Sequence, residues 1–353
     1  MPGRKPRVPA MVRPTLLAAA FLGVLVATLL VAWYGIDAVG DAFLAAGWQG
    51  LTLVCLLHLL PLWLCGAAWR AVSAGGSGEV HPARTLLYVR ARWIRDAVGG
   101  LIGILPIAGE AVGARVLALH GVRPAALAGA VTVVDVTAET LSQVPFTILG
   151  VALLAATRPG SDLLWWTGVA LATAVPASGL VVAVSSTRLL GWLDAVADMA
   201  ARSIAPQWRD VGSPADGGTL AGQVRALLRC RRGFLASAAL HFAAWVAATA
   251  EAWAALRAMG HPIGLAEAVA LESLMHALRG VAFMVPWSAG VQEGGYVVVG
   301  ALFGIGPEAA LALSLVKRAR DLILGVPALL AWQLVEGRRL AARRSGEGGA
   351  APT

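Results

Sequence analysis

The chain has 353 residues, of which 58% are hydrophobic and 14% are charged, and its mean hydropathy is +0.73. This balance leaves too few polar side chains to cover a soluble domain of this size, so it excludes a soluble globular protein and predicts an integral membrane protein. The formal net charge of +8 arises from arginines beside apolar segments rather than from one basic module, and it therefore disfavours a nucleic-acid-binding protein.

A helix needs about 20 consecutive apolar residues to cross a bilayer. By that measure we predict an all-α polytopic membrane protein whose full spans, about six in number, are 15–34, 50–69, 124–156, 163–184, 234–256 and 308–335. The first span follows a basic tail, but its apolar run is too long for a secretory signal and lacks a convincing small-residue cleavage site. We therefore expect a retained anchor. The third span is long enough to be tilted, or bent at Pro145.

The basic residues predict the orientation of these spans. Of the 28 lysines and arginines, 20 fall in the N-terminal tail, in 70–95, in 185–232 and in the C-terminal tail. The opposite loops hold only Arg158 and Arg257. Because loops rich in Lys and Arg stay in the cytoplasm, we expect both termini to be cytoplasmic.

The same pattern predicts the domain organisation. We expect one transmembrane domain over 1–340, made of a first half, 15–184, and a second half, 234–340. A cytoplasmic connection over 185–232 would join the halves, and 341–353 would form a disordered cytoplasmic tail.

Two segments resemble each other in their spacing: "LPIAGEAVGARVLALHGVRPAALAGAVTVVD" (105–135) and "VPWSAGVQEGGYVVVGALFGIGPEAALALSLVKRARD" (285–321). Three residues of the first recur 183 positions later in the second: Glu110 as Glu293, Gly121 as Gly304 and Pro124 as Pro307. The match predicts either an internal repeat or two helix breaks of similar chemistry. On both interpretations the segments around Pro106 and Pro286 are re-entrant broken helices. A true repeat would be inverted, an arrangement that places transporter sites near the bilayer midplane.

Glu110 and Glu293 are the first candidate site residues. Each follows a proline within a glycine-bearing turn and would begin a half-helix, where free N–H groups and the helix dipole can face a substrate or an ion. The alternative is structural, since each glutamate can instead cap its own helix break or pair with a nearby arginine, such as Glu110 with Arg115.

Other polar residues share helix faces beside the breaks, because side chains three or four residues apart lie together. They are Asp135 and Glu139, then Glu272, His276 and Arg279, and finally Lys317, Arg318, Arg320 and Asp321 in the last span. Charges within a membrane usually face a bundle interior or an aqueous cavity. The last group also has a structural interpretation, in which Asp321 forms an ion pair with Lys317 or Arg318. Its basic residues outnumber its one acid, so an anionic lipid headgroup or a neighbouring carboxylate is needed to balance their charge.

Four stretches carry a family resemblance: "RDAVGGLIGILPIAGEAVGARVLALHGV", "VVDVTAET", "ESLMHALRGVAFMVPWSAGVQEGGY" and "ALSLVKRARDLILGVPALLAWQLVEGRR". They resemble the hopanoid-biosynthesis-associated membrane proteins of the HpnL type, which are similar to the flippase-like transmembrane domain of lysylphosphatidylglycerol synthases. The resemblance is strongest at the Gln-Glu-Gly-Gly run, which adds Gln292 to the candidates, and at Lys-Arg-x-Arg-Asp. It implies a bacterial inner-membrane protein that moves or handles a lipid such as a hopanoid. Ala-Gly-Glu at Glu110 departs from the expected Gly-Gly-Glu.

Three functions stay open. The first is a lipid flippase or transport protein, in which the breaks and charges form a polar track for a headgroup of a hopanoid or an anionic lipid. The second is a noncatalytic scaffold that recruits lipid-biosynthetic or export proteins through 185–232. The third is a membrane-embedded lipid-modifying enzyme that uses Asp135 and Glu139 as acid and base. Aminoacyl transfer is not expected, since the synthases carry a soluble catalytic domain after their membrane part and this chain ends soon after its last span.

No cofactor or metal is expected. The six histidines show no metal-ligand spacing, the three cysteines form no zinc or disulfide framework, and nucleotide-binding motifs are missing from the sequence.

Overall fold

The computed structural model describes the residues in 36–74, 85–102, 107–122, 125–159, 220–281 and 288–347, with a few single positions besides. The predicted span 15–34, nearly all of 163–184 and most of the connection 185–232 lie outside the described residues. The same holds for Pro106 and Pro286 at the predicted breaks.

Every element in the described part of the chain is helical, which confirms the all-α prediction. The elements are α2 (Ile36–Ala74), α3 (Thr85–Ala97), the π-helix η1 (Val98–Ile102), α4 (Ala108–Leu119), α5 (Ala125–Thr157), α8 (Leu220–Arg229), α9 (Arg231–Ala258), α10 (Leu265–Val281), α11 (Val291–Ala301) and α12 (Pro307–Glu347).

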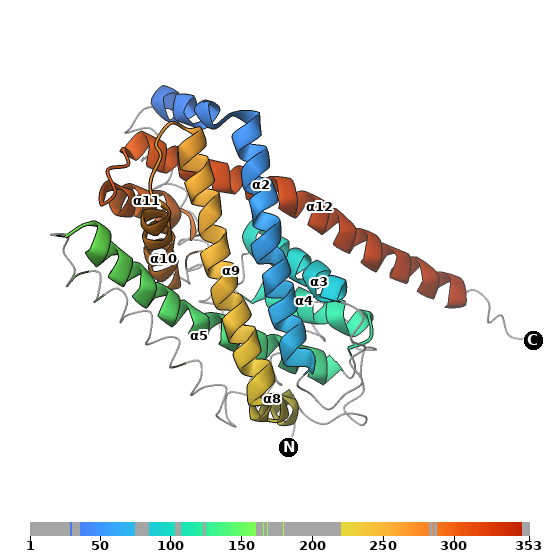
Figure 1. Ribbon diagram of the computed structural model, residues 1–353. Coiled ribbons are helices and arrows are strands. Elements are labelled where there is room, and N and C mark those ends of the chain that lie inside the picture. Colours follow the sequence, from blue (N-terminus) through green and yellow to red (C-terminus); the bar gives the residue numbers. More distant parts are fainter. Residues whose placement is uncertain are drawn as a thin grey trace, which may run out of the picture.

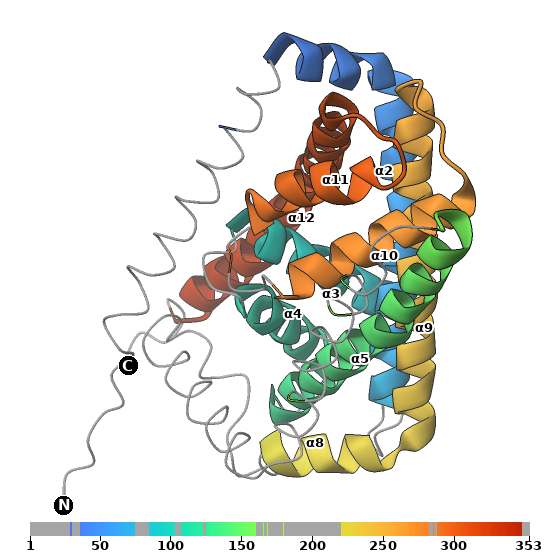
Figure 2. The same cartoon turned by 90° about the vertical axis from the view of Figure 1, so that its left-hand side faces the viewer.

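Helices α2 and α9 lie side by side along their length and run in opposite directions, and in Figure 2 they form one side of the described part of the fold (Figures 1 and 2). Gly47, with φ 62°, breaks α2 into a short N-terminal piece and a long helix. A positive φ is readily adopted by glycine, so the chain can turn sharply there. The short piece lies across one end of the α2–α9 pair, and α8 lies across the other end (Figure 2).

Within the part of the chain that the structure describes, three helices are long and apolar enough to cross a membrane: Val39–Ala74, Ala126–Thr157 and Arg231–Ala258. They coincide with the predicted spans 50–69, 124–156 and 234–256. The predicted span 308–335 is part of α12, which does not meet the same criterion. The reason is its charged residues. Lys317 to Asp321 interrupt the apolar sequence in the first half of α12, and Glu336 and the arginines after it interrupt the second half.

Helices α4 and α11 are too short to cross a bilayer. They have 12 and 11 residues. At about 1.5 Å per residue each spans less than 20 Å, against a hydrocarbon core of about 30 Å. Each is followed by a glycine of positive φ, Gly121 (109°) and Gly304 (75°), and then by a long helix, α5 or α12. These short helices are the described parts of the segments predicted to be re-entrant.

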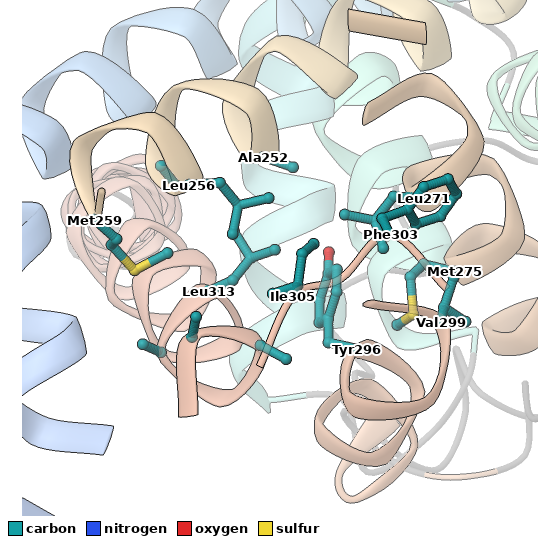
Figure 3. Close-up of a cluster of buried hydrophobic side chains, with 14 of the residues drawn as sticks. Ala252, Leu256, Met259, Leu271, Met275, Tyr296, Val299, Phe303, Ile305 and Leu313 are labelled. Atoms are coloured by element: carbon teal, nitrogen blue, oxygen red, sulfur yellow. The ribbon is translucent and has the colours of Figure 1, made fainter. Parts of the chain in front are cut away.

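The buried apolar side chains of the described residues form two clusters. The first joins α2, α3, α4, α5 and α8, with Trp69, Tyr88 and Ile94 among its members, and it also includes Ala328 of α12. The second joins α9, α10, α11 and α12 with residues of α2 and α5, so both halves of the chain contribute to each cluster (Figure 3). Figure 3 shows Tyr296 standing among apolar side chains such as Ile305 and Leu313. Its hydroxyl group therefore needs a polar partner inside the protein.

A stripe of large apolar side chains on α2 is exposed. It consists of Leu53, Leu56, Leu60 and Trp63. A spacing of three or four residues puts these side chains on one helix face. Such a face suits contact with lipid tails, so the described surface agrees with a membrane location.

Candidate functional site

Most of the buried charged side chains among the described residues gather in two places. The first ionic cluster contains Arg92, Arg95 and Asp96 from α3, Glu110 from α4, Asp135 and Glu139 from α5, and His241 from α9. The second ionic cluster contains Glu251 from α9, Glu272 and Arg279 from α10, Glu293 from α11, and Lys317, Arg318, Arg320 and Asp321 from α12.

Two arginines of α3 hold the first ionic cluster together. Arg92 donates from both terminal nitrogens to Glu139, at 2.9 and 2.7 Å, and from Nε to Asp96 at 2.8 Å. Arg95 donates to Glu139 at 2.9 Å, to Asp135 at 3.2 Å and to Glu110 at 3.4 Å. Paired guanidinium and carboxylate groups of this geometry offset the cost of burying the charges.

Asp135 joins the arginines of α3 to His241 of α9 within the first ionic cluster. Its side chain is fully buried, and so is that of His241. Oδ1 lies 3.0 Å from His241 Nε2 and accepts a longer hydrogen bond of 3.4 Å from Ser237, while Oδ2 accepts from Arg95. Asp135 therefore contacts side chains of both halves of the chain.

The ligand atoms of Asp135, Glu139 and His241 lie within 4.8 Å of one another, a spacing that a metal ion can bridge. The carboxylate oxygens, however, already accept hydrogen bonds from Arg92 and Arg95. A cation placed there would face two guanidinium groups, so we assign no metal to these residues. The grouping corrects the sequence interpretation in one respect, because His241 does lie beside two carboxylates.

Glu272 is the buried centre of one part of the second ionic cluster. It accepts from Lys317 Nζ at 2.6 Å and from the Tyr296 hydroxyl at 2.7 Å. Arg279 donates to the same hydroxyl at 3.3 Å and lies over the Tyr296 ring. The polar partner that Tyr296 requires within the second apolar cluster is therefore a carboxylate.

Glu293 both caps a helix and forms an ion pair. Its Oε2 accepts from the backbone N–H of Gly290 at 2.8 Å, so it satisfies a donor at the start of α11. Its Oε1 accepts from Arg318 Nε at 2.7 Å and from Ser314 at 3.0 Å. Gln292 beside it donates to the same Ser314 hydroxyl at 2.9 Å.

Arg320 completes the second ionic cluster. It donates to Glu251 of α9 and, at 2.6 Å, to Asp321. The other oxygen of Glu251 lies 3.0 Å from His58 Nδ1 of α2. Glu251 therefore joins α2, α9 and α12 deep in the fold.

A family model described as the lysylphosphatidylglycerol synthase TM region matches residues 20–328. The chain belongs to this family. The match contains every residue of both ionic clusters, and it supports a membrane protein with a lipid-related role. No curated protein and no solved structure matches the chain. Within this family, the finer resemblance to proteins of the HpnL type stays a prediction.

For this member of the family, several predicted pairings are wrong. Glu110 contacts Arg95, whereas Arg115 binds Glu336 of α12 at 3.0 Å. Lys317 and Arg318 pair with Glu272 and Glu293 rather than with Asp321. The reason is distance in space, because the partners on other helices approach these side chains more closely than the neighbours on the same helix do. The basic residues of α12 are thus balanced by neighbouring carboxylates.

His276 differs from the residues that share its helix face. Its ring lies 4.4 Å from the Trp245 ring and 6.0 Å from the Phe146 ring. It packs among aromatic side chains and has no ion pair among the described contacts. Glu110 and Glu293 also have different partners, so their approach to one shared cavity stays a prediction.

Sequence reasoning missed four important members of these clusters: Arg92, Arg95, His241 and Glu251. The two arginines were attributed to a cytoplasmic loop, but they lie in α3 with buried side chains. Their three-residue spacing, which puts them on one helix face, was the available signal. His241 and Glu251 are polar residues inside a predicted span, which is itself a reason to suspect a role.

Proposed function

We propose that the protein is a bacterial inner-membrane lipid flippase or lipid-transport protein of the HpnL type, noncatalytic, which handles a lipid with a polar headgroup such as a hopanoid. The observation that carries this proposal is the pair of ionic clusters inside a bundle of membrane helices. Membership of the lysylphosphatidylglycerol synthase TM region family supports a lipid-related role.

Charges at membrane depth are costly, and they usually mark a pathway for a substrate or an ion. Each cluster passes from fully buried groups to partly exposed ones. In the first, Asp135 is fully buried whereas the Glu110 side chain is 32% exposed. In the second, Glu293 is 4% exposed whereas Arg318 is 33% exposed. The partly exposed members are the groups that a lipid headgroup can reach without unpairing the buried ones.

We further propose that the two halves form an inverted repeat. The long part of α2, which follows Gly47, begins 183 residues before α9. The starts of α3, α4 and α5 precede those of α10, α11 and α12 by 180, 183 and 182 residues. The positive φ of Gly121 and Gly304 and the opposite directions of α2 and α9 in Figures 1 and 2 agree with an inverted copy. Inverted copies allow alternating access by movement of one half against the other.

The two ends of the α2–α9 pair differ in charge. The α8 end carries exposed arginines, Arg225, Arg229, Arg231 and Arg232, whereas the short piece of α2 at the other end carries exposed Asp37 and Asp41. Because basic residues remain on the cytoplasmic side, this difference supports a cytoplasmic α8 end. The distribution of lysine and arginine along the sequence supports both termini on the same side.

A scaffold and a lipid-modifying enzyme are the alternatives. A scaffold that recruits lipid-biosynthetic or export proteins has no use for charges inside the membrane. For an enzyme, Asp135 and Glu139 would have to exchange protons with a substrate, but both are already bonded to arginines. The contacts therefore favour transport over both alternatives.

The test begins with the lipids that copurify with the protein, identified by mass spectrometry. The main copurifying lipid is then labelled, and its movement between leaflets is followed in proteoliposomes, with protein-free liposomes as the control. We expect movement that depends on the protein. Chemical conversion of the lipid would instead establish the enzyme, and an unchanged leaflet distribution would overturn the transport proposal.

A further inference from the structure

We propose that His241 binds a proton at Nδ1 and that this proton drives the movement of the two halves, an inference that rests on the transport function proposed above. The geometry behind it is the contact between His241 of α9 and Asp135 of α5, buried at the point where the first ionic cluster meets the second half of the chain.

The two ring nitrogens of His241 have different surroundings. Nε2 lies 3.0 Å from Asp135 Oδ1, and a carboxylate only accepts, so Nε2 carries a hydrogen and donates. Nδ1 is buried and makes no hydrogen bond of good geometry among the described residues. The thiol of Cys65 on α2 lies near the ring and can accept weakly. Nδ1 is therefore the atom that gains or loses a proton, while Nε2 stays bound to Asp135.

The charges around the ring favour an added positive charge. Helix α3 brings Arg92, Arg95 and Asp96, α4 brings Glu110, and α5 brings Asp135 and Glu139. Among the described residues, the other polar neighbours are Ser237 on α9 itself and Cys65 on α2. Four carboxylates thus face two guanidinium groups. With a neutral imidazole the cluster has two excess negative charges, and a proton on Nδ1 removes one of them.

A proton suits this place better than a sodium ion. Sodium needs several free oxygen atoms, but the oxygens of Asp135 and Glu139 already accept from Arg95, Arg92 and His241. An imidazole needs no such shell, because the proton binds directly to the Nδ1 lone pair.

The proton also has a mechanical effect. A charged imidazolium holds Asp135 more strongly than a neutral imidazole does, and so it tightens the contact between α5 and α9. Loss of the proton weakens this contact between the first and second halves. Proton binding and release at His241 thereby bias the protein towards one of two arrangements of the halves.

The direct test is nitrogen NMR of the full chain in lipid nanodiscs, with ¹⁵N-labelled histidine. His241→Gln removes one ring's signals and so assigns them. We expect Nδ1 of His241 to lose its proton as the pH rises, while Nε2 stays protonated, and we expect Asp135→Asn to weaken proton binding at Nδ1. A ring whose Nδ1 stays unprotonated at acid pH, or which loses the proton from Nε2 instead, would overturn the proton site.

The coupling is tested in proteoliposomes with the labelled copurifying lipid under an imposed pH gradient. We expect the wild-type rate to depend on the gradient and His241→Gln to lose that dependence. His120→Gln is the matched control, because among the described residues the His120 ring has a hydrogen bond only with the Val116 carbonyl of α4, the helix that it follows. Gradient-independent wild-type transport would overturn the coupling. A protein that moves no lipid at all would overturn the proposed function, while the NMR result would still decide the proton site.

Discussion

Glu293→Gln has a matched control in Glu267→Gln, because the two glutamates make the same pair of contacts in different places. Glu267 accepts from the backbone N–H of Gly264 at 2.9 Å and pairs with Arg158 at 2.8 Å. Glu293 accepts from Gly290 at 2.8 Å and pairs with Arg318 at 2.7 Å. Each is the third residue of its helix, α10 or α11. Only Glu293 belongs to an ionic cluster.

Glutamine keeps an oxygen that can cap the helix, but it removes the charge and brings N–H donors near the arginine. Loss of one partner from a fully buried ion pair costs about 3–5 kcal/mol. Because Arg318 is partly exposed, we expect a smaller loss for Glu293→Gln, about 1–3 kcal/mol in the free energy of unfolding. The Arg158–Glu267 pair is more exposed, at 42% and 20%, so Glu267→Gln should cost about 0–1 kcal/mol.

The effect on transport should separate the variants further. Glu293 holds Arg318, the partly exposed group that can bind a headgroup. A charge-assisted hydrogen bond to a headgroup is worth about 1.5–3 kcal/mol, so misplacement of Arg318 should lower the transport rate about 10- to 100-fold. We therefore expect strong inhibition by Glu293→Gln and near-normal transport by Glu267→Gln. The assays are lipid movement in proteoliposomes and thermal unfolding in detergent. Equal inhibition by both variants would refute a special role for the charge of Glu293, and normal transport by Glu293→Gln would assign that residue to the helix break alone.

Three further predictions concern the buried pairs, the packing and the topology. Lys317→Met should cost about 3–5 kcal/mol in thermal unfolding, since it leaves buried Glu272 without its cation, and the added change Glu272→Met should restore much of the loss. Gly66→Ala should cost about 1–3 kcal/mol, because a Cβ there would lie 2.6 Å from the Val89 backbone, whereas Gly40→Ala meets nothing within 4 Å and should be tolerated. A cysteine added at the C-terminus should react with membrane-impermeant reagents only from the cytoplasmic side, and labelling from outside would reverse the proposed orientation.

Much of the fold was predictable because apolar length and hydrophobic composition act locally. The spans at 50–69, 124–156 and 234–256 are described as helices, and the glycines at 121 and 304 end short helices beside the predicted breaks. The pairing of charges was not predictable in this way. Helical spacing shows that Lys317 and Asp321 share a face, but it does not show that Glu272, 45 residues away, lies 2.6 Å from Lys317.

The proposed repeat explains why the two clusters occupy similar places and yet differ in charge. The offset of 183 residues relates Glu110 to Glu293, and both pair with an arginine. The same offset relates Asp135 to Arg318, so equivalent positions on α5 and α12 carry opposite charges.

As a result the first ionic cluster has four carboxylates against two arginines, whereas the second has four carboxylates against four basic residues. An excess of negative charge favours proton binding in the first, and the partly exposed Arg318 gives the second a cation for an anionic headgroup. On this argument, the double variant Asp135→Arg, Arg318→Asp should lose both proton binding at the first ionic cluster and headgroup binding at the second. Each half would then carry the charge that the other half requires.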